Sequence, residues 1–94
     1  MHRDADRPLL VNPLVIMKKM PSGAVLMDTA TGQCFELNRT GTEIWTEIER
    51  GVPPGKIIQA IAARYGLTEG EVAADAWTLV DQLLDQRIVR VAPP

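Results

Sequence analysis

Few residues in this 94-residue chain could act as nucleophiles, general bases or metal ligands: it has one histidine, His2, one cysteine, Cys34, and one serine, Ser22. A catalytic base must be held in fixed geometry, which a terminal segment such as that around His2 seldom provides. Cys34 has no histidine in a structured segment to activate it, so we interpret it as a small packing residue. Ser22 falls in a predicted turn and cannot complete a serine triad.

Cofactor and metal sites are also poorly supported by the sequence. The glycines match neither the spacing of a P-loop nor that of a dinucleotide-binding loop. One cysteine and one histidine cannot form a structural zinc site. Carboxylates are plentiful, but most fall where predicted helices meet solvent. We therefore expect no catalysis, no metal and no cofactor.

Composition indicates one small domain. Hydrophobic residues make up 46% of the chain, enough for a compact core, although only four residues are aromatic. No apolar run approaches the roughly 20 residues that cross a bilayer, and the charged N-terminus leads into no signal peptide. The single cysteine fits a reducing cytoplasm, and a net charge of -2 gives no general attraction to nucleic acid or anionic membranes. We expect a cytoplasmic domain with no membrane partner.

The first 37 residues are predicted to form an N-terminal arm followed by three strands. Residues 1–13 combine both signs of charge with two prolines and indicate a flexible N-terminal arm. The segments 14–19, 24–28 and 33–37 are apolar or alternating, and turn sequences separate them. Short turns between successive strands favour an antiparallel meander.

The rest of the chain is predicted to be helical. After Asn38 the apolar period becomes helical, and Thr40 with Glu43 matches a capping box, although Asn38 could cap the helix instead. A second helix follows the prolines at 53 and 54 and is expected to stop at Gly66. A third begins at the capping box of residues 68–71 and runs to about Gln86.

This order of elements predicts an α+β fold, a three-stranded antiparallel sheet followed by a three-helix bundle, with helices over one face of the sheet. The order also fits a winged helix-turn-helix with the wing placed first. Residues 88–91 form either a short terminal strand or a segment packed across the sheet. We expect one domain over residues 14–91 and a tail over 92–94.

The third helix argues against a DNA-binding role for such a fold. A winged helix reads DNA with basic and amide side chains of its recognition helix. Residues 66–86 contain no lysine or arginine, but they contain five carboxylates. Carboxylates are repelled by a phosphate backbone and release no counterions. A DNA-binding regulator therefore remains only as an alternative from a different class.

Two apolar stripes run along the third helix. One contains Val72, Ala76, Leu79 and Leu83, and the other contains Ala73, Trp77, Val80 and Leu84. Both stripes could be core, or part of the second could line a groove beside an edge strand. The strand at 33–37 has no proline or lysine to block such an edge. An edge with an adjacent apolar groove is what a peptide needs in order to add as a further strand.

The stretch from Phe35 to Trp45, FELNRTGTEIW, resembles the LN-x-T-G-x-x-I-W pattern of the PqqD family. Gly51, the helical segment 57–65 and the apolar residues of 75–83 resemble the rest of that pattern, so the likeness covers about residues 24–91. Arg87 departs from it, because many relatives have glycine there, and Ala76 stands where valine is commoner.

The resemblance implies a peptide chaperone of pyrroloquinoline quinone (PQQ) biosynthesis. Such proteins bind the leader of a ribosomal precursor peptide and present it to a radical SAM enzyme, which cross-links a glutamate and a tyrosine. Related domains recognise leaders in other modified-peptide pathways, including those of lasso peptides. The family fold adds the leader as a fourth strand between the third strand and the third helix.

Carried onto this chain, the resemblance implies a peptide-binding site on the third strand and the third helix. The expected residues are Cys34, Phe35, Glu36, Leu37, Ala73, Asp75, Trp77, Val80, Asp81 and Leu84. Leu37 also suits the core, and Asn38 suits a helix cap better than a peptide contact. The acidic residues suggest that a basic leader residue docks there. An unpaired edge also makes a homodimer plausible when no peptide is present.

Overall fold

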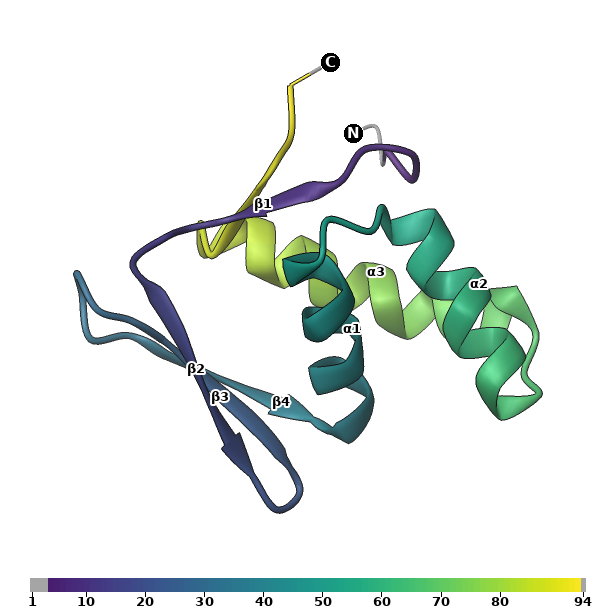
Figure 1. The fold of residues 1–94 in the computed structure, drawn as a ribbon, viewed down its shortest axis with the longest axis horizontal. Coiled ribbons are helices and arrows are strands. Elements are labelled where there is room, and N and C mark those ends of the chain that lie inside the picture. Colours follow the sequence, from purple (N-terminus) through teal and green to yellow (C-terminus); the bar gives the residue numbers. More distant parts are fainter. Residues whose placement is uncertain (1–3, 94) are drawn as a thin grey trace.

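The structure, a computed structural model, describes residues 4–93. The elements in chain order are β1 (Leu9–Val11), β2 (Val15–Met20), β3 (Gly23–Asp28), β4 (Cys34–Asn38), α1 (Arg39–Glu49), α2 (Pro54–Tyr65), α3 (Glu69–Asp85) and β5 (Val89–Val91). The predicted α+β fold is confirmed: an antiparallel sheet of order β2-β3-β4 precedes three helices. The helices lie to one side of this sheet (Figure 1), as in winged-helix-like domains.

The helix-facing side of the β2–β4 sheet packs in the core. Side chains alternate along a strand, and the buried Ala24 and Leu26 of β3 are paired with Leu37 and Phe35 of β4. Gly23 lies under β4 so closely that a Cβ on it would come 1.9 Å from the carbonyl oxygen of Leu37. Only glycine therefore fits where the β2–β3 turn passes the end of β4.

Each helix begins at a sequence signal. Asn38 caps α1, because its side chain accepts a 2.7 Å hydrogen bond from the Gly41 amide. The alternative cap is therefore the one used, and the prediction of Thr40 as the cap is wrong. Pro54 occupies the first turn of α2. Thr68 and Glu71 form the predicted capping box of α3. Two side-chain caps and a first-turn proline thus mark the three helix starts.

The core lies between the sheet and the helices. The largest fully buried side chains come from β3 and all three helices: Trp45, Leu26, Ile48, Ile57, Ile61, Leu83 and Val80. Both α3 stripes contribute, because Val72, Ala76 and Leu83 of the first and Val80 of the second are buried. The core is therefore aliphatic around a single buried tryptophan.

The expectation of a flexible arm before residue 14 does not hold at Leu9–Val11. These residues form β1, which pairs antiparallel with β5, so Leu9 lies opposite Val91 and Val11 opposite Val89. Leu9 is 3% exposed and belongs to the core. The folded domain therefore begins before residue 14, because β1 is paired and packed with the rest of it. Of the two alternatives for residues 88–91, the short terminal strand is the one present, as β5. Residues 1–3, including His2, and residue 94 lie outside the described part.

Candidate functional site

β4 has one free edge. The sheet order places β3 on one side of β4, and the Asp28 amide donates to the carbonyl oxygen of Gln33 at 2.9 Å. Backbone groups alternate in direction along an antiparallel strand, so the odd-numbered residues of 33–37 bond to β3. The N–H and C=O groups of Cys34 and Glu36 therefore point away from β3. They give β4 a row of donors and acceptors on its open side.

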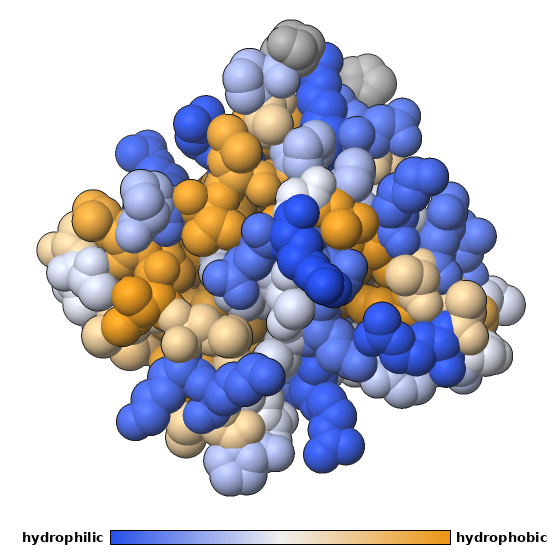
Figure 2. Space-filling model, in the orientation of Figure 1, coloured by the Kyte–Doolittle hydropathy of each residue, from blue (hydrophilic) through white to orange (hydrophobic). Residues whose placement is uncertain are grey.

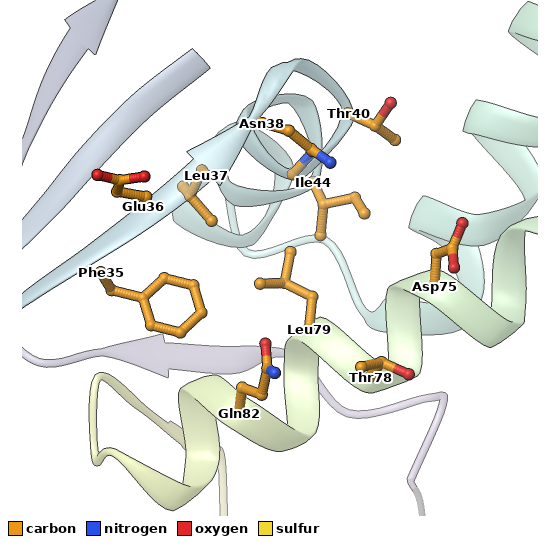
Figure 3. Close-up of a pocket in the computed structure, with 11 residues that line it drawn as sticks. Phe35, Glu36, Leu37, Asn38, Thr40, Ile44, Asp75, Thr78, Leu79 and Gln82 are labelled. Atoms are coloured by element: carbon orange, nitrogen blue, oxygen red, sulfur yellow. The ribbon is translucent and has the colours of Figure 1, made fainter. Parts of the chain in front are cut away.

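A groove of about 370 Å³ lies along this open side, between β4, the start of α1, and α3. Its lining consists of Phe35, Glu36, Leu37, Asn38, Thr40, Gly41, Ile44, Asp75, Thr78, Leu79 and Gln82. In Figure 3 the side chains of Phe35, Leu37 and Leu79 turn into the space between strand and helix. Edge, groove and helix thus run side by side.

The apolar floor of the groove continues into the core. Leu37 and Ile44 are 5% and 3% exposed, while Phe35 and Leu79 are half-buried against the core cluster. Gly41 lets α1 approach this floor, because a Cβ there would come 3.2 Å from Asn38 Oδ1 and 3.4 Å from Leu37 Cδ2. The floor is therefore supported from beneath and suits apolar side chains of a ligand.

The groove carries acidic and neutral polar groups but no basic ones. Asp75, Thr78 and Gln82 project from α3 along its far wall. The Glu36 side chain points to the other side of β4 from Phe35 and Leu37 (Figure 3), so its contribution to the lining lies next to the strand edge. None of the eleven lining residues is lysine or arginine. Asp75 is thus the carboxylate best placed to meet a basic ligand group.

A second pocket, of about 320 Å³, adjoins the groove beyond the end of β4. The two share Thr40, Ile44 and Asp75. Its outer wall includes Tyr65, whose hydroxyl donates to both Glu43 carboxylate oxygens, at 2.8 and 2.7 Å. Arg64 reaches the same carboxylate at 3.0 Å, which ties α2 to α1 at this corner.

The Glu43 carboxylate raises the pKa of Tyr65 above 10.0. The largest cause is the hydrogen bond that the phenol donates, because this bond is lost when the hydroxyl ionises. Desolvation and the negative charge of Glu43 act in the same direction, and the positive charges of Arg64 and Arg39 oppose them. The phenol therefore stays neutral, and its hydrogen bond to Glu43 holds α2 against α1, at all ordinary pH values.

The structure brings together part of the residue set expected from sequence. Phe35, Glu36, Leu37 and Asp75 line the groove. Cys34 belongs to β4, but its side chain is exposed and its Sγ lies 3.8 Å from the Gly32 carbonyl oxygen. Cys34 can therefore reach a strand ligand only through its backbone.

Five expected residues of α3 do not line the groove. Val80 is 2% exposed in the core. Ala73 faces the start of α2, and Leu84 lies beside β1 and β5. Trp77 and Asp81 are half-buried elsewhere on the helix. No residue of the second apolar stripe therefore lines this groove.

Three of the four α3 residues that line this groove are not in the expected set. Asp75, Thr78, Leu79 and Gln82 follow the spacing i, i+3, i+4, i+7 of a single helix face. The face is mixed in polarity, so a search for apolar stripes does not select it. On the strand side, the start of α1 adds Thr40, Gly41 and Ile44.

Groups for metal binding or membrane insertion are not found in residues 4–93. No set of three histidine, cysteine, aspartate or glutamate side chains is close enough together to hold a metal ion there. Within the same residues, no helix has the length and apolar character needed to span a bilayer. What the groove offers is a strand edge, apolar side chains and a carboxylate.

Two solved structures share this fold. One is described as "TbiB1 in Complex with the TbiA(beta) Leader Peptide": it has 25% sequence identity and a TM-score of 0.79, over 90% of this chain and 99% of that chain. The other, "Lasso peptide synthetase B1 complexed with the leader peptide", has 22% identity and a TM-score of 0.75, over 90% and 98%. At that identity the second comparison supports the fold alone.

Sequence comparison identifies the family. No curated protein matches the chain in sequence. Residues 23–89, well over half of the chain, match the family described as "Coenzyme PQQ synthesis protein D (PqqD)". The matched region runs from the start of β3 into β5 and so contains β4, α1 and α3, the three elements that form the groove. With its fold shared by two leader-peptide complexes and its groove inside the matched region, the chain belongs to the PqqD family.

Proposed function

We propose that this protein binds the leader of a ribosomal precursor peptide as an additional strand on β4. The observation that carries the proposal is the free edge of β4 lying along the groove against α3. An incoming strand would pair with the open backbone groups of Cys34 and Glu36 and place alternate side chains against Phe35 and Leu79. The backbone supplies affinity, and the groove selects the side chains.

The proposed role is that of a chaperone without catalysis of its own. The groove offers backbone groups, apolar side chains and the Asp75 carboxylate, which suit holding a peptide. A peptide held at a sheet edge keeps the rest of its chain free for a partner enzyme. The solved structure with 25% identity is a complex with a leader peptide, which supports this role.

For the pathway, we propose PQQ biosynthesis, with a radical SAM enzyme as partner and a precursor whose glutamate and tyrosine become cross-linked. The family match supports this choice. The alternative is the same recognition role in another modified-peptide pathway, which the TbiB1 complex with the TbiA(beta) leader peptide supports. The DNA-binding alternative gains no support, because α3 carries five carboxylates and no basic residue.

The first test is a titration of the protein with the precursor peptide encoded beside its gene, followed by NMR. We expect saturable binding, with shifts at 33–38 and at Asp75, Thr78, Leu79 and Gln82. Shifts centred instead on Ala73, Trp77 and Leu84 would place the peptide on the other side of α3. A folded sample that binds no neighbouring precursor would rule out the leader-binding proposal.

A pair of arginine substitutions tests the groove. Thr78→Arg places a long side chain where the peptide would lie, whereas Ala74→Arg adds the same charge to an exposed position that does not line the groove. We expect Thr78→Arg to weaken binding at least about tenfold, or 1.4 kcal/mol, and Ala74→Arg to change it less than about threefold. Equal losses in both variants would count against the groove.

Reconstitution tests the pathway. Purified radical SAM enzyme and precursor are incubated with wild-type protein, with Thr78→Arg, or with neither, and the glutamate–tyrosine cross-link is followed by mass spectrometry. We expect cross-linking to need the wild-type protein. If the peptide binds but cross-linking proceeds equally without the protein, the PQQ assignment fails while leader binding stands.

A further inference from the structure

The side of the β2–β4 sheet that faces away from the helices is open and mostly apolar. Because side chains alternate, the residues next to the buried Ala24 and Leu26 of β3 point outward. The outward residues are Ile16, Lys18, Met20, Val25, Met27, Cys34 and Glu36. Ile16 is 52% exposed and Met20 47%. Apolar side chains gather over this end of the molecule in Figure 2.

Strand register arranges these residues in rows across the sheet. Met27 pairs with Ile16 on one side and with Cys34 on the other, which makes an apolar row. Val25 pairs with Lys18 on one side and with Glu36 on the other. The second row therefore carries a positive charge on β2, an apolar centre on β3 and a negative charge on β4.

This charged row is self-complementary. If two such sheets stack face to face about a two-fold axis parallel to β3, β2 of each copy lies over β4 of the other. Lys18 of each copy then faces Glu36 of its partner, and the two Val25 side chains meet at the centre. Both ion pairs follow from one symmetry operation, because Lys18 and Glu36 are one strand away from Val25 in opposite directions.

We propose that two copies of this chain associate through these outer sheet faces, with reciprocal Lys18–Glu36 pairs. The groove opens on the helix side of β4, so each copy keeps its free strand edge. The inference does not depend on leader binding. It concerns the opposite face of the sheet, and its test contains no peptide.

The area available predicts a weak complex. Three strands spaced about 4.8 Å apart, with about six residues at 3.3 Å each, give a face on the order of 300 Å² per copy. Stable interfaces bury about 800 Å² per partner. We therefore expect a dissociation constant in the high micromolar to millimolar range, with strong sensitivity to salt.

Charge reversal tests the pairing directly. Sedimentation velocity at low salt, up to roughly 1 mM protein, should show wild-type dimers. Lys18→Glu or Glu36→Lys alone should weaken association at least about tenfold, because each places like charges in contact twice. An equimolar mixture of the two variants should associate again, since every contact in the mixed dimer is then opposite in sign. The double variant should behave like the wild type.

Lys19→Glu is the matched control, because Lys19 is the exposed neighbour whose side chain points to the other side of β2. This substitution should change the dissociation constant of the dimer by less than about threefold. Circular dichroism verifies that every variant is folded. Monomeric wild type at roughly 1 mM, equal effects of Lys18→Glu and Lys19→Glu, or a mixture that stays monomeric would each overturn the proposal. If the wild type is monomeric, the outer sheet face would be available to a different protein instead.

Discussion

On β4, neighbouring residues serve opposite faces of the sheet. Phe35 turns its ring toward α3, and Leu37 closes the groove floor, while Cys34 and Glu36 present side chains to the outer face and backbone groups to the free edge. A substitution on this strand therefore changes the side chains of one surface at a time. The side chain of Glu36 lies on the outer face, whereas its N–H and C=O lie at the strand edge beside the groove.

Asp75 should control the salt dependence of peptide binding. If a basic leader residue docks in the groove, Asp75→Asn removes its partner and weakens binding by up to about 1 kcal/mol at low salt, or about fivefold. Calorimetry at two salt concentrations measures this effect, with Glu69→Gln, on the same helix outside the groove, as control. Wild-type binding that is indifferent to salt would exclude a docked basic residue.

Tyr65 should titrate above its ordinary pKa of 10.0, because the neutral phenol is bonded to Glu43. It is the only tyrosine in the chain, so its ultraviolet titration is unambiguous. Because folding raises this pKa, the Tyr65–Glu43 hydrogen bond contributes its full stabilisation of the folded state below pH 10. That contribution is lost as the pH rises through the folded-state pKa of Tyr65. Glu43→Gln should lower the pKa toward 10.0, whereas Glu47→Gln, one turn further along α1, should leave it unchanged.

Each helix ends in the same hydrogen-bonded motif. The amides of Val52, Leu67 and Ile88 donate to carbonyls five residues earlier, across a residue with positive φ. That residue is glycine after α1 and α2, at Gly51 and Gly66. After α3 it is Arg87, with φ 58°. The departure from the family pattern at this position thus falls where the backbone is left-handed.

Arg87→Gly should therefore stabilise the protein. The left-handed conformation costs a non-glycine residue about 1–2 kcal/mol, and the greater chain entropy of glycine offsets about 0.5–1 of that. We expect a net gain of about 1 kcal/mol in the free energy of unfolding, measured with urea. Arg90→Gly, within β5, should instead destabilise by about 0.5–1 kcal/mol. A loss in both variants would show that the Arg87 backbone is not strained.

At the scale of the whole molecule, β1 and β5 join the two ends of the chain. Leu9 pairs with Val91 and packs in the core, and the Ala92 amide donates to the Pro8 carbonyl oxygen at 3.0 Å. The Gly55 amide also donates to the Ala5 carbonyl oxygen, at 2.8 Å, which holds the N-terminal segment against α2. Residues 5–11 are therefore part of the folded unit.

Leu9→Ala should accordingly cost about 2–5 kcal/mol of unfolding free energy, as expected for a large side chain removed from a core. Leu10→Ala is the control, because Leu10 points to the other face of β1 and is exposed; it should cost less than about 1 kcal/mol. Chemical denaturation measures both variants. Equal and small effects would mean that β1 contributes little to the folded state.

The sequence by itself determined the local structure of this protein. Alternation located β2 to β4 within about one residue, and caps at Asn38, Thr68 and Gly66 positioned the helices, because these signals act between residues close in the chain. It also suggested β4 as an open edge, because residues 33–37 contain no proline or lysine. The resemblance to the PqqD family came from the same contiguous stretch.

Only the tertiary structure decided which face of α3 meets β4. Periodicity shows which residues share a helix face, but the rotation of the helix in the fold depends on packing against the sheet and two other helices at once. Packing turned Asp75, Thr78 and Leu79 to the groove and Val80 to the core. The β1–β5 pairing was equally invisible, since three-residue strands 80 positions apart carry no local signal, and only the folded chain brings Leu9 beside Val91.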